Sequence, residues 1–234
     1  MFLRCITLIL RAVQTGEIKI KVRFFWQKMP PKQESNVQLS KKLTWLLRHG
    51  AVKEGIAIQA DGFVNISDIQ SHPRYAVFSL QKLQEIVADD AKQRYILRWN
   101  EDAKFHEIRA NQGHSLAAVQ GEACLERISN AKQVPLAVHG TYYRCWEAIK
   151  VQGLGRMRRN YVHFAVSDVG ETLSGFRSDS QLLVYLDVAK VLADNMPLFR
   201  SSNNVILCAG VDGFIDKTYF SRAVDRRTGQ QLRY

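Results

Sequence analysis

The sequence predicts an α+β protein built from two lobes, and three observations support this prediction. Apolar residues in the first half recur at helical spacing, a β-hairpin pattern follows them, and the pattern after His114 changes to short apolar stretches separated by turns. At 234 residues with 46% apolar content, the chain can bury one large core or two small ones. Two small cores fit the spacing of the motifs better.

Residues 1–36 are predicted to be a basic extension that belongs to neither lobe. Between Met1 and Lys28, six lysines and arginines stand against one acid, Glu17. No stretch approaches the roughly 20 apolar residues of a membrane span. Two interpretations stay open: a mitochondrial presequence, which usually carries more serine, or a region upstream of a working start at Met29. Either way, we expect these residues to be poorly ordered.

Charge and cysteine content indicate an intracellular protein that binds a polyanion. The formal net charge of +11 favours attraction to RNA, although ribosomal and chromatin proteins have similar charge. The four cysteines lack the paired spacing of a zinc site or a disulfide framework, so no metal is expected. Cys208 lies in an apolar run and is predicted to be a core residue. The expected compartment is cytoplasmic or nuclear, or mitochondrial if the extension is a presequence.

The first lobe is predicted to span residues 37–115 and to begin with a helix. Leu39, Leu43 and Leu47 fall on one helical face, and Gly50 is expected to end the helix. Arg48 and His49 then lie in its last turn. Two roles remain open for them, because cations at a helix C-terminus also stabilise the helix dipole.

The rest of this lobe has the order of a winged helix. A turn and a short strand over Asp61–Asp68 are predicted to enter a helix, and Ser79 is predicted to cap another. The segments Tyr95–Trp99 and Phe105–Arg109 flank a polar loop, as the strands of a hairpin do. Helices followed by a hairpin indicate a winged-helix-like lobe.

The second lobe, residues 116–234, is predicted to contain a mixed or antiparallel sheet. We expect helices over Glu122–Asn130 and Tyr142–Gln152, the latter ended by Gly153. Short apolar runs predict strands at Leu136–Val138, Val162–Ala165, Leu182–Asp187, Val205–Cys208 and near Tyr219–Ala223.

Four runs carry most of the functional information. They are Leu47-Arg48-His49, Ile108–Ser115, Val138–Thr141 and Gly153–Phe164, and they combine arginine, histidine, glycine and amide side chains. Together and in this order they resemble the RNA 2′-phosphotransferase family, and the resemblance extends from about Leu39 to Phe220. This family removes the splice-junction 2′-phosphate from tRNA.

The resemblance implies a two-step transfer to NAD⁺, used as a co-substrate without metal. The RNA 2′-phosphate attacks the nicotinamide ribose and expels nicotinamide, giving a 2′-phospho-ADP-ribosylated RNA. A ribose hydroxyl then attacks phosphorus and releases 2′-hydroxyl RNA and ADP-ribose 1″,2″-cyclic phosphate. The implied partner is a tRNA or another RNA with an internal 2′-phosphate, with no membrane, and the protein is expected to be a monomer.

By the same resemblance, the catalytic residues are Arg48, His49, Arg109 and Arg159. A phosphate dianion needs no general base to become a nucleophile, so such a site should be rich in arginine and poor in carboxylates. Arginine stays charged and presents a planar fork that matches phosphate oxygens. His49 is expected either to donate to a phosphate oxygen or to move the proton of the attacking hydroxyl. Arg158 is expected to be a solvated residue that contacts RNA phosphates.

The resemblance also implies that the second lobe is a divergent ADP-ribosyltransferase-like fold that binds NAD⁺. It has no G-x-G-x-x-G fingerprint. Tyr161 departs from the family, which usually has histidine there, and we expect it to tune function rather than abolish it. The cofactor-binding residues carried over from the family are His139, Gly140, Thr141, His163, Ser174, Gly175 and Arg177.

Two other functions stay open. The chain is alternatively an ADP-ribosyltransferase that modifies terminal phosphates of nucleic acids, or a noncatalytic RNA-binding protein with the same fold. His114 is expected to orient a loop or contact RNA. Trp45, Trp99 and Trp146 are expected to pack in cores, although Trp99 beside the hairpin is also suited to stacking on a base.

Overall fold

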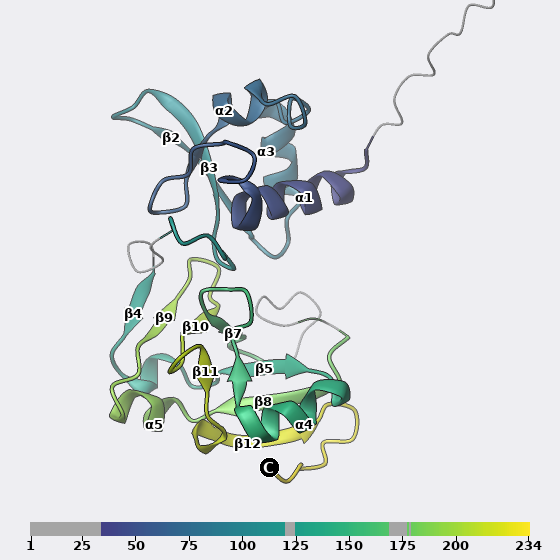
Figure 1. The fold of residues 1–234 in the computed structure, drawn as a ribbon, viewed down its shortest axis with the longest axis vertical. Coiled ribbons are helices and arrows are strands. Elements are labelled where there is room, and N and C mark those ends of the chain that lie inside the picture. Colours follow the sequence, from purple (N-terminus) through teal and green to yellow (C-terminus); the bar gives the residue numbers. More distant parts are fainter. Residues whose placement is uncertain (1–33, 120–124, 169–176, 178) are drawn as a thin grey trace, which may run out of the picture. The chain divides into compact units, whose positions relative to one another are not determined.

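The computed structural model describes residues 34–119, 125–168, 177 and 179–234 (Figure 1). Helices and strands both occur, and every strand pairing among the described residues is antiparallel, which confirms the α+β prediction. Two large clusters of buried apolar side chains lie in separate stretches of sequence, one between Leu39 and Val119 and the other between Ile128 and Ala223.

The first cluster lies between short helices and a three-stranded sheet. The sheet has the strand order β1-β3-β2, and Tyr95 pairs with Ala110 at the end of the hairpin. Its helices bury Leu43, Ile69 and Leu83 completely. The elements are α1 (Asn36–Trp45), η1 (Leu46–Gly50), β1 (Val64–Asn65), α2 (Ile66–Ser71), α3 (Leu80–Ala88), β2 (Tyr95–Asn100) and β3 (Phe105–Ala110).

Polar side chains cap these helices at the points where the chain enters them. The hydroxyl of Ser79 accepts a hydrogen bond from the Lys82 amide, as predicted, and Asn65 accepts one from the Ser67 amide at α2. At α1, Ser35 and Gln38 form a reciprocal capping box. The first described helix therefore begins at Asn36, slightly before the predicted start of the lobe, and residues 1–33 of the predicted extension lie outside the described residues.

The end of the first helix differs from the prediction. The helical stretch ends at Gly50 as predicted, but α1 stops at Trp45 and the last turn is π-helical, η1, in which the Ala51 amide donates to the Leu46 carbonyl. Glycine is needed at position 50 for space: a Cβ there would lie 2.3 Å from Cζ3 of Trp45. Arg48 and His49 therefore lie in a π turn instead of the last turn of an α-helix.

The second cluster lies among several small antiparallel sheets. A four-stranded sheet has the order β4-β9-β10-β7, a three-stranded sheet has the order β12-β8-β5, and β11 pairs with β6. Backbone hydrogen bonds between Val138 and Ala165 join β5 to the end of β7. Figure 1 shows β5, β8 and β12 side by side. The strands are β4 (Glu126–Ile128), β5 (Val138–Thr141), β6 (Leu154–Gly155), β7 (Val162–Phe164), β8 (Leu182–Leu186), β9 (Leu198–Arg200), β10 (Ile206–Cys208), β11 (Phe214–Ile215) and β12 (Phe220–Asp225).

Helices in this half connect the strands. The predicted helix after His139 is present as α4 (Tyr143–Gln152), and Gly153 ends it with a φ of 81°. The elements η3 (Ala131–Gln133), α5 (Val188–Ala193) and η4 (Lys217–Tyr219) complete the described fold.

The prediction of a helix over Glu122–Asn130 is wrong. The first residues of that range lie outside the described part, and Glu126–Ile128 form β4, whose backbone hydrogen bonds come from β9. Glu126 and Arg127 are both exposed and only Ile128 is buried, so this three-residue strand does not show the alternating pattern by which a strand is predicted.

Only one of the three tryptophans expected in cores is buried. Trp146 is 7% exposed, whereas Trp45 and Trp99 are 38% and 43% exposed. Trp99 packs edge to face against His106 on the hairpin. Among the residues that the structure describes, no helix is both long enough and apolar enough to cross a bilayer.

Candidate phosphate-binding site

Two of the predicted catalytic residues lie in η1, between buried leucines. Leu46 and Leu47 are fully buried, so the π turn is held against the first core, while Arg48 and His49 are half-buried. The Nε of Arg48 is buried and has no hydrogen-bond partner among the described residues. The Nδ1 of His49 lies 2.8 Å from the Ser115 hydroxyl.

The segment Gly113-His114-Ser115 connects this turn to the rest of the site. The Ser115 amide donates to the Arg48 carbonyl at 3.0 Å, and the His114 carbonyl accepts from the Asn160 amide at 3.0 Å. Gly113 has a φ of 89°, and a Cβ there would lie 3.2 Å from Nε of Arg48. This segment therefore contacts two parts of the chain that are far apart in sequence.

Arg109 reaches the site from β3. Its Nη1 donates to the Asp61 carbonyl at 3.2 Å, and its guanidinium lies over the Phe63 ring, 4.8 Å from the ring centre. Its Nε is buried without a partner among the described residues. A small cavity lined by Arg109, Gly113 and Tyr161, among other residues, lies beside it.

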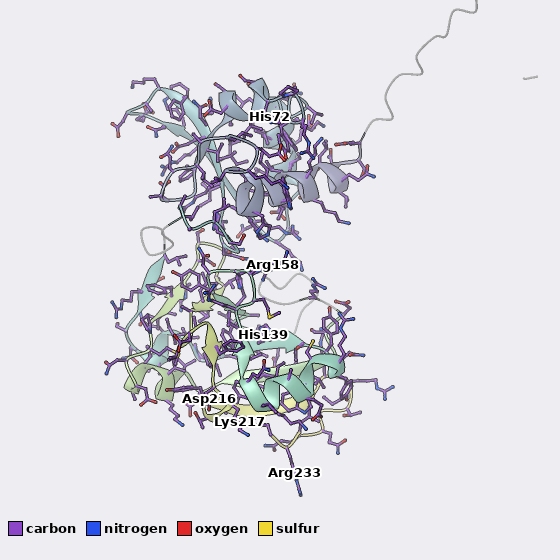
Figure 2. All side chains as sticks on the ribbon, viewed as in Figure 1. His72, His139, Arg158, Asp216, Lys217 and Arg233 are labelled. Atoms are coloured by element: carbon purple, nitrogen blue, oxygen red, sulfur yellow. The ribbon has the colours of Figure 1, made fainter. Side chains whose placement is uncertain are left out.

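Arg159 comes from the loop between β6 and β7. Its amide donates to the Arg156 carbonyl at 3.1 Å, and Nη1 of Arg156 donates back to the Arg159 carbonyl at 2.7 Å. The Arg156 amide in turn donates to the Gly213 carbonyl. These bonds hold the turn that carries Arg159, while Arg158 (labelled in Figure 2) is exposed.

His139 and His163 each have one ring nitrogen tied to the backbone. Nδ1 of His139, on β5 (Figure 2), lies 2.9 Å from the His163 carbonyl, and Nδ1 of His163 lies 3.0 Å from the Tyr161 carbonyl. Since a carbonyl only accepts, both Nδ1 atoms carry the proton. Burial and the charge of Arg159 lower the pKa of both rings, so both are neutral near pH 7 with Nε2 as an acceptor.

Positive charge accumulates here from several elements. Burial lowers the pKa of Arg48 to about 10, and the neighbouring charge of Arg159 contributes to that shift. Burial and then Arg177 lower the pKa of Arg159, although its side chain remains exposed to solvent. Burial, followed by Arg48 and Arg109, lowers the pKa of His114 to about 4. Guanidinium groups at such proximity repel one another unless an anion lies among them.

The remaining predicted residues are only partly placed. Gly140 and Thr141 lie on β5 opposite Leu183 and Leu182, and Thr141 is buried. Arg177 is electrostatically coupled to Arg159, and its own pKa is raised by a hydrogen bond with the hydroxyl of Tyr142. The predicted residues Ser174 and Gly175 lie outside the described residues.

Sequence reasoning missed two residues that build the site. Ser115 had no assigned role, although it stands at the end of the run that contains Arg109. Asn160 lies next to Arg159, and its amide forms the hydrogen bond to His114. Neither has a local sequence signal, because each contacts a partner more than 40 residues away.

The predictions for Cys208 and for metal have different outcomes. Cys208 is fully buried in β10, as predicted, and burial raises its pKa to about 11. Within the described ranges, no group of three or more histidine, cysteine, aspartate or glutamate side chains is gathered in a way that could hold a metal ion. The expectation of metal-independent chemistry stays a prediction.

Comparison with known proteins identifies the family. The tRNA 2′-phosphotransferase 1 of Mus musculus is 39% identical over 202 residues, which are 85% of this chain and 80% of that protein. The Homo sapiens protein of the same name is 39% identical over 201 residues, 85% of this chain and 79% of that protein. A Schizosaccharomyces pombe relative is 39% identical over 198 residues, 84% of this chain and 53% of that protein. A family model matches residues 34–210, so this chain belongs to the RNA 2′-phosphotransferase, Tpt1/KptA family.

Proposed function

We propose that this protein is an NAD⁺-dependent RNA 2′-phosphotransferase that removes the splice-junction 2′-phosphate from tRNA. The observation that carries the proposal is the convergence of Arg48 and Arg159, from a π turn and a loop, on His49, with Arg109 from a strand end joined to this cluster through His114. Its family membership supports an enzyme that acts on RNA. We also assign a winged-helix-like character to the first lobe and an ADP-ribosyltransferase-like character to the second.

The guanidinium groups fit a 2′-phosphate dianion. Arg48 and Arg109 each have a buried Nε without a partner among the described residues. An unpaired buried donor costs about 1–3 kcal/mol, which an oxygen acceptor from a ligand recovers. Such fixed donors also stabilise negative charge that develops on phosphate oxygens during transfer.

The histidines fit a ribose. His163 Nε2 is buried without a partner among the described residues, and the tautomers of His139 and His163 make both Nε2 atoms acceptors for hydroxyl donors. NAD⁺, when bound, supplies the electrophilic ribose carbon and the hydroxyl that completes phosphate release. His139, Gly140, Thr141, His163, Ser174, Gly175 and Arg177 are the residues that we propose to hold it.

His49 is placed to act on a proton. Burial and the charges of Arg48 and Arg159 lower its pKa below 6.5, so the ring is neutral at pH 7. Because Nδ1 is engaged by Ser115, Nε2 is the nitrogen available to a substrate. A neutral imidazole can donate from one nitrogen or accept at the other, which suits proton transfer from an attacking hydroxyl.

The direct test is mass spectrometry of both products after incubation with NAD⁺ and an RNA that bears one internal 2′-phosphate, without added metal. Dephosphorylated RNA together with ADP-ribose 1″,2″-cyclic phosphate is the expected result. RNA that keeps ADP-ribose would instead indicate the terminal-phosphate ADP-ribosyltransferase, and unchanged RNA that binds the protein would indicate a noncatalytic RNA-binding protein.

Neighbouring arginines provide a matched pair of variants. We expect Arg159→Ala to lower kcat/KM by roughly a hundredfold to a thousandfold, the usual cost of removing one fixed donor to developing charge. Arg158→Ala removes an equal charge from the same loop, yet it should lower kcat/KM only slightly, because the charge that acts on Arg48 and His49 is that of Arg159. Equal losses in both variants would refute the assignment of Arg159 to the site.

A further inference from the structure

The cationic cluster opens into a hollow that is much larger than one phosphate needs. This hollow has a volume of about 670 Å³, and Arg48, His49 and Arg159 lie in its wall. The remaining wall comes from α1, from the end of α3 and from the segment that follows α3. A 2′-phosphate is attached to a nucleotide within a strand, so this space is available to the flanking sugar and base.

Trp45 lies in the same wall, and its ring packs against Gly50. Its ring lies against the backbone of Gly50, where a Cβ would come within 2.3 Å of Cζ3. The next two residues, Leu46 and Leu47, are fully buried and anchor the backbone that carries it. The indole is nevertheless 38% exposed, so a large aromatic surface faces the hollow without a protein side chain to cover it fully.

The charges around Trp45 favour a nucleic acid strand. Lys41, one helical turn before Trp45, is exposed and lies in the same wall. The two acids in the wall are already engaged: Asp90 forms an ion pair with Arg94, and Asp89 accepts a hydrogen bond from the Asn36 amide group. The hollow therefore combines free positive charge with an aromatic ring, the combination that binds single-stranded nucleic acids.

We propose that Trp45 is the stacking platform for the nucleobase next to the nucleotide that bears the 2′-phosphate, and that Lys41 neutralises the backbone phosphate of that neighbour. This inference rests on the proposed function, because it takes RNA as the substrate. Stacking accepts every base, so Trp45 would position the strand without selecting a sequence.

Binding of a fluorescein-labelled RNA trinucleotide with one central 2′-phosphate, measured by anisotropy without NAD⁺, tests this proposal. We expect Trp45→Leu to weaken binding roughly fivefold to a hundredfold, the usual range for loss of one base–aromatic stack. Trp45→Phe keeps an aromatic ring and should recover most of the affinity. The matched control is Tyr143→Leu, which removes a comparably exposed aromatic ring from α4, outside the wall of the hollow, and should leave the affinity unchanged.

A second RNA separates stacking from support of the fold. It carries abasic sites on both sides of the 2′-phosphorylated nucleotide, and the parent protein should bind it as weakly as Trp45→Leu binds the intact RNA. Trp45→Leu should then lose no further affinity for the abasic RNA. An equal loss on intact and abasic RNA would refute stacking, as would unchanged binding of the intact RNA.

The outcomes for this proposal and for the proposed function are distinguishable. Binding without NAD⁺ depends on the RNA contacts alone, whereas the product assay depends on transfer. Trp45-dependent binding by a protein that leaves the RNA chemically unchanged would refute the proposed function and keep the stacking platform. Phosphate transfer by a protein whose RNA binding and activity do not depend on Trp45 would keep the proposed function and refute the stacking platform.

Discussion

His114 should make the folded protein sensitive to acid. Its imidazole is largely buried, and the charges of Arg48, Arg109 and His49 face it. Its Nε2 is buried without a hydrogen-bond partner within the described part of the chain. Burial, followed by the charges of Arg48 and Arg109, disfavours a proton on the ring and lowers its folded pKa from 6.5 to about 4.

The sign and size of the effect follow from that shift. Because the folded pKa is lower than the unfolded one, the unfolded chain binds more protons between pH 6.5 and 4. The free energy of unfolding is therefore complete above pH 6.5 and falls as the pH drops toward 4. A change from 6.5 to about 4 corresponds to roughly 3 kcal/mol, or about 6–12 °C in Tm for a chain of this size.

Urea denaturation at pH 7.0 and 4.5 measures this effect. The parent should lose stability over this interval, and His114→Gln, which keeps a polar group but cannot titrate, should lose roughly 2–3 kcal/mol less than the parent. Lowered pKa values of His139 and His163 act in the same direction and remain in the variant. His106→Gln on the hairpin is the control and should follow the parent. If His114→Gln also follows the parent, the imidazole is not the buried, charge-repelled group described above.

Two further substitutions test the local geometry. Ser115→Ala removes the hydroxyl beside His49 but keeps the hydrogen bond from the Ser115 backbone amide to the Arg48 carbonyl. We therefore expect kcat/KM to fall roughly twofold to tenfold and its pH profile to change, while Ser115→Thr retains activity. An unaltered pH profile in Ser115→Ala would contradict this role of Ser115. Gly153→Ala places a Cβ 2.2 Å from the Ile215 carbonyl oxygen at a φ of 81°, so it should lower Tm by more than the several degrees that the strained backbone alone costs. Gly229→Ala, with φ of 73° and open space, isolates the backbone cost, and equal Tm losses in the two variants would show that the close approach at position 153 is unimportant.

Elements with a strong local signal could be predicted from the sequence. The helix capped by Ser79, the hairpin over residues 95–110 and the helix that ends at Gly153 are all present. Elements that depend on a distant partner were missed. β4 is held by β9, and the two-residue strands β6 and β11 are defined only by pairing with each other. Such short strands contain too few residues to show an alternating pattern.

In the candidate site, too, residues within motifs could be predicted and residues with distant partners could not. The arginine and histidine residues could be named from their motifs, and the described structure places Arg48, His49 and Arg159 within electrostatic reach of one another, with Arg109 joined to them through His114. The role of Ser115 could not be predicted, because a serine hydroxyl has no periodic signal and its partner is 66 residues earlier. The expectation that Trp45 packs in a core was wrong. Its ring packs on one side against Gly50 and is 38% exposed, and the sequence does not show that these two residues are in contact.

The sequence by itself determined the chemical character of this protein: its positive charge, the arginine and histidine motifs, and the local propensities that produce its longer helices and its hairpin. Only the tertiary structure decided which nitrogen of each histidine is free, which arginines share one charge cluster, and which tryptophan faces the hollow beside it. The reason is physical. Residue type fixes charge and hydrogen-bonding capacity, whereas pKa, tautomer and exposure depend on neighbours that folding brings from distant parts of the chain.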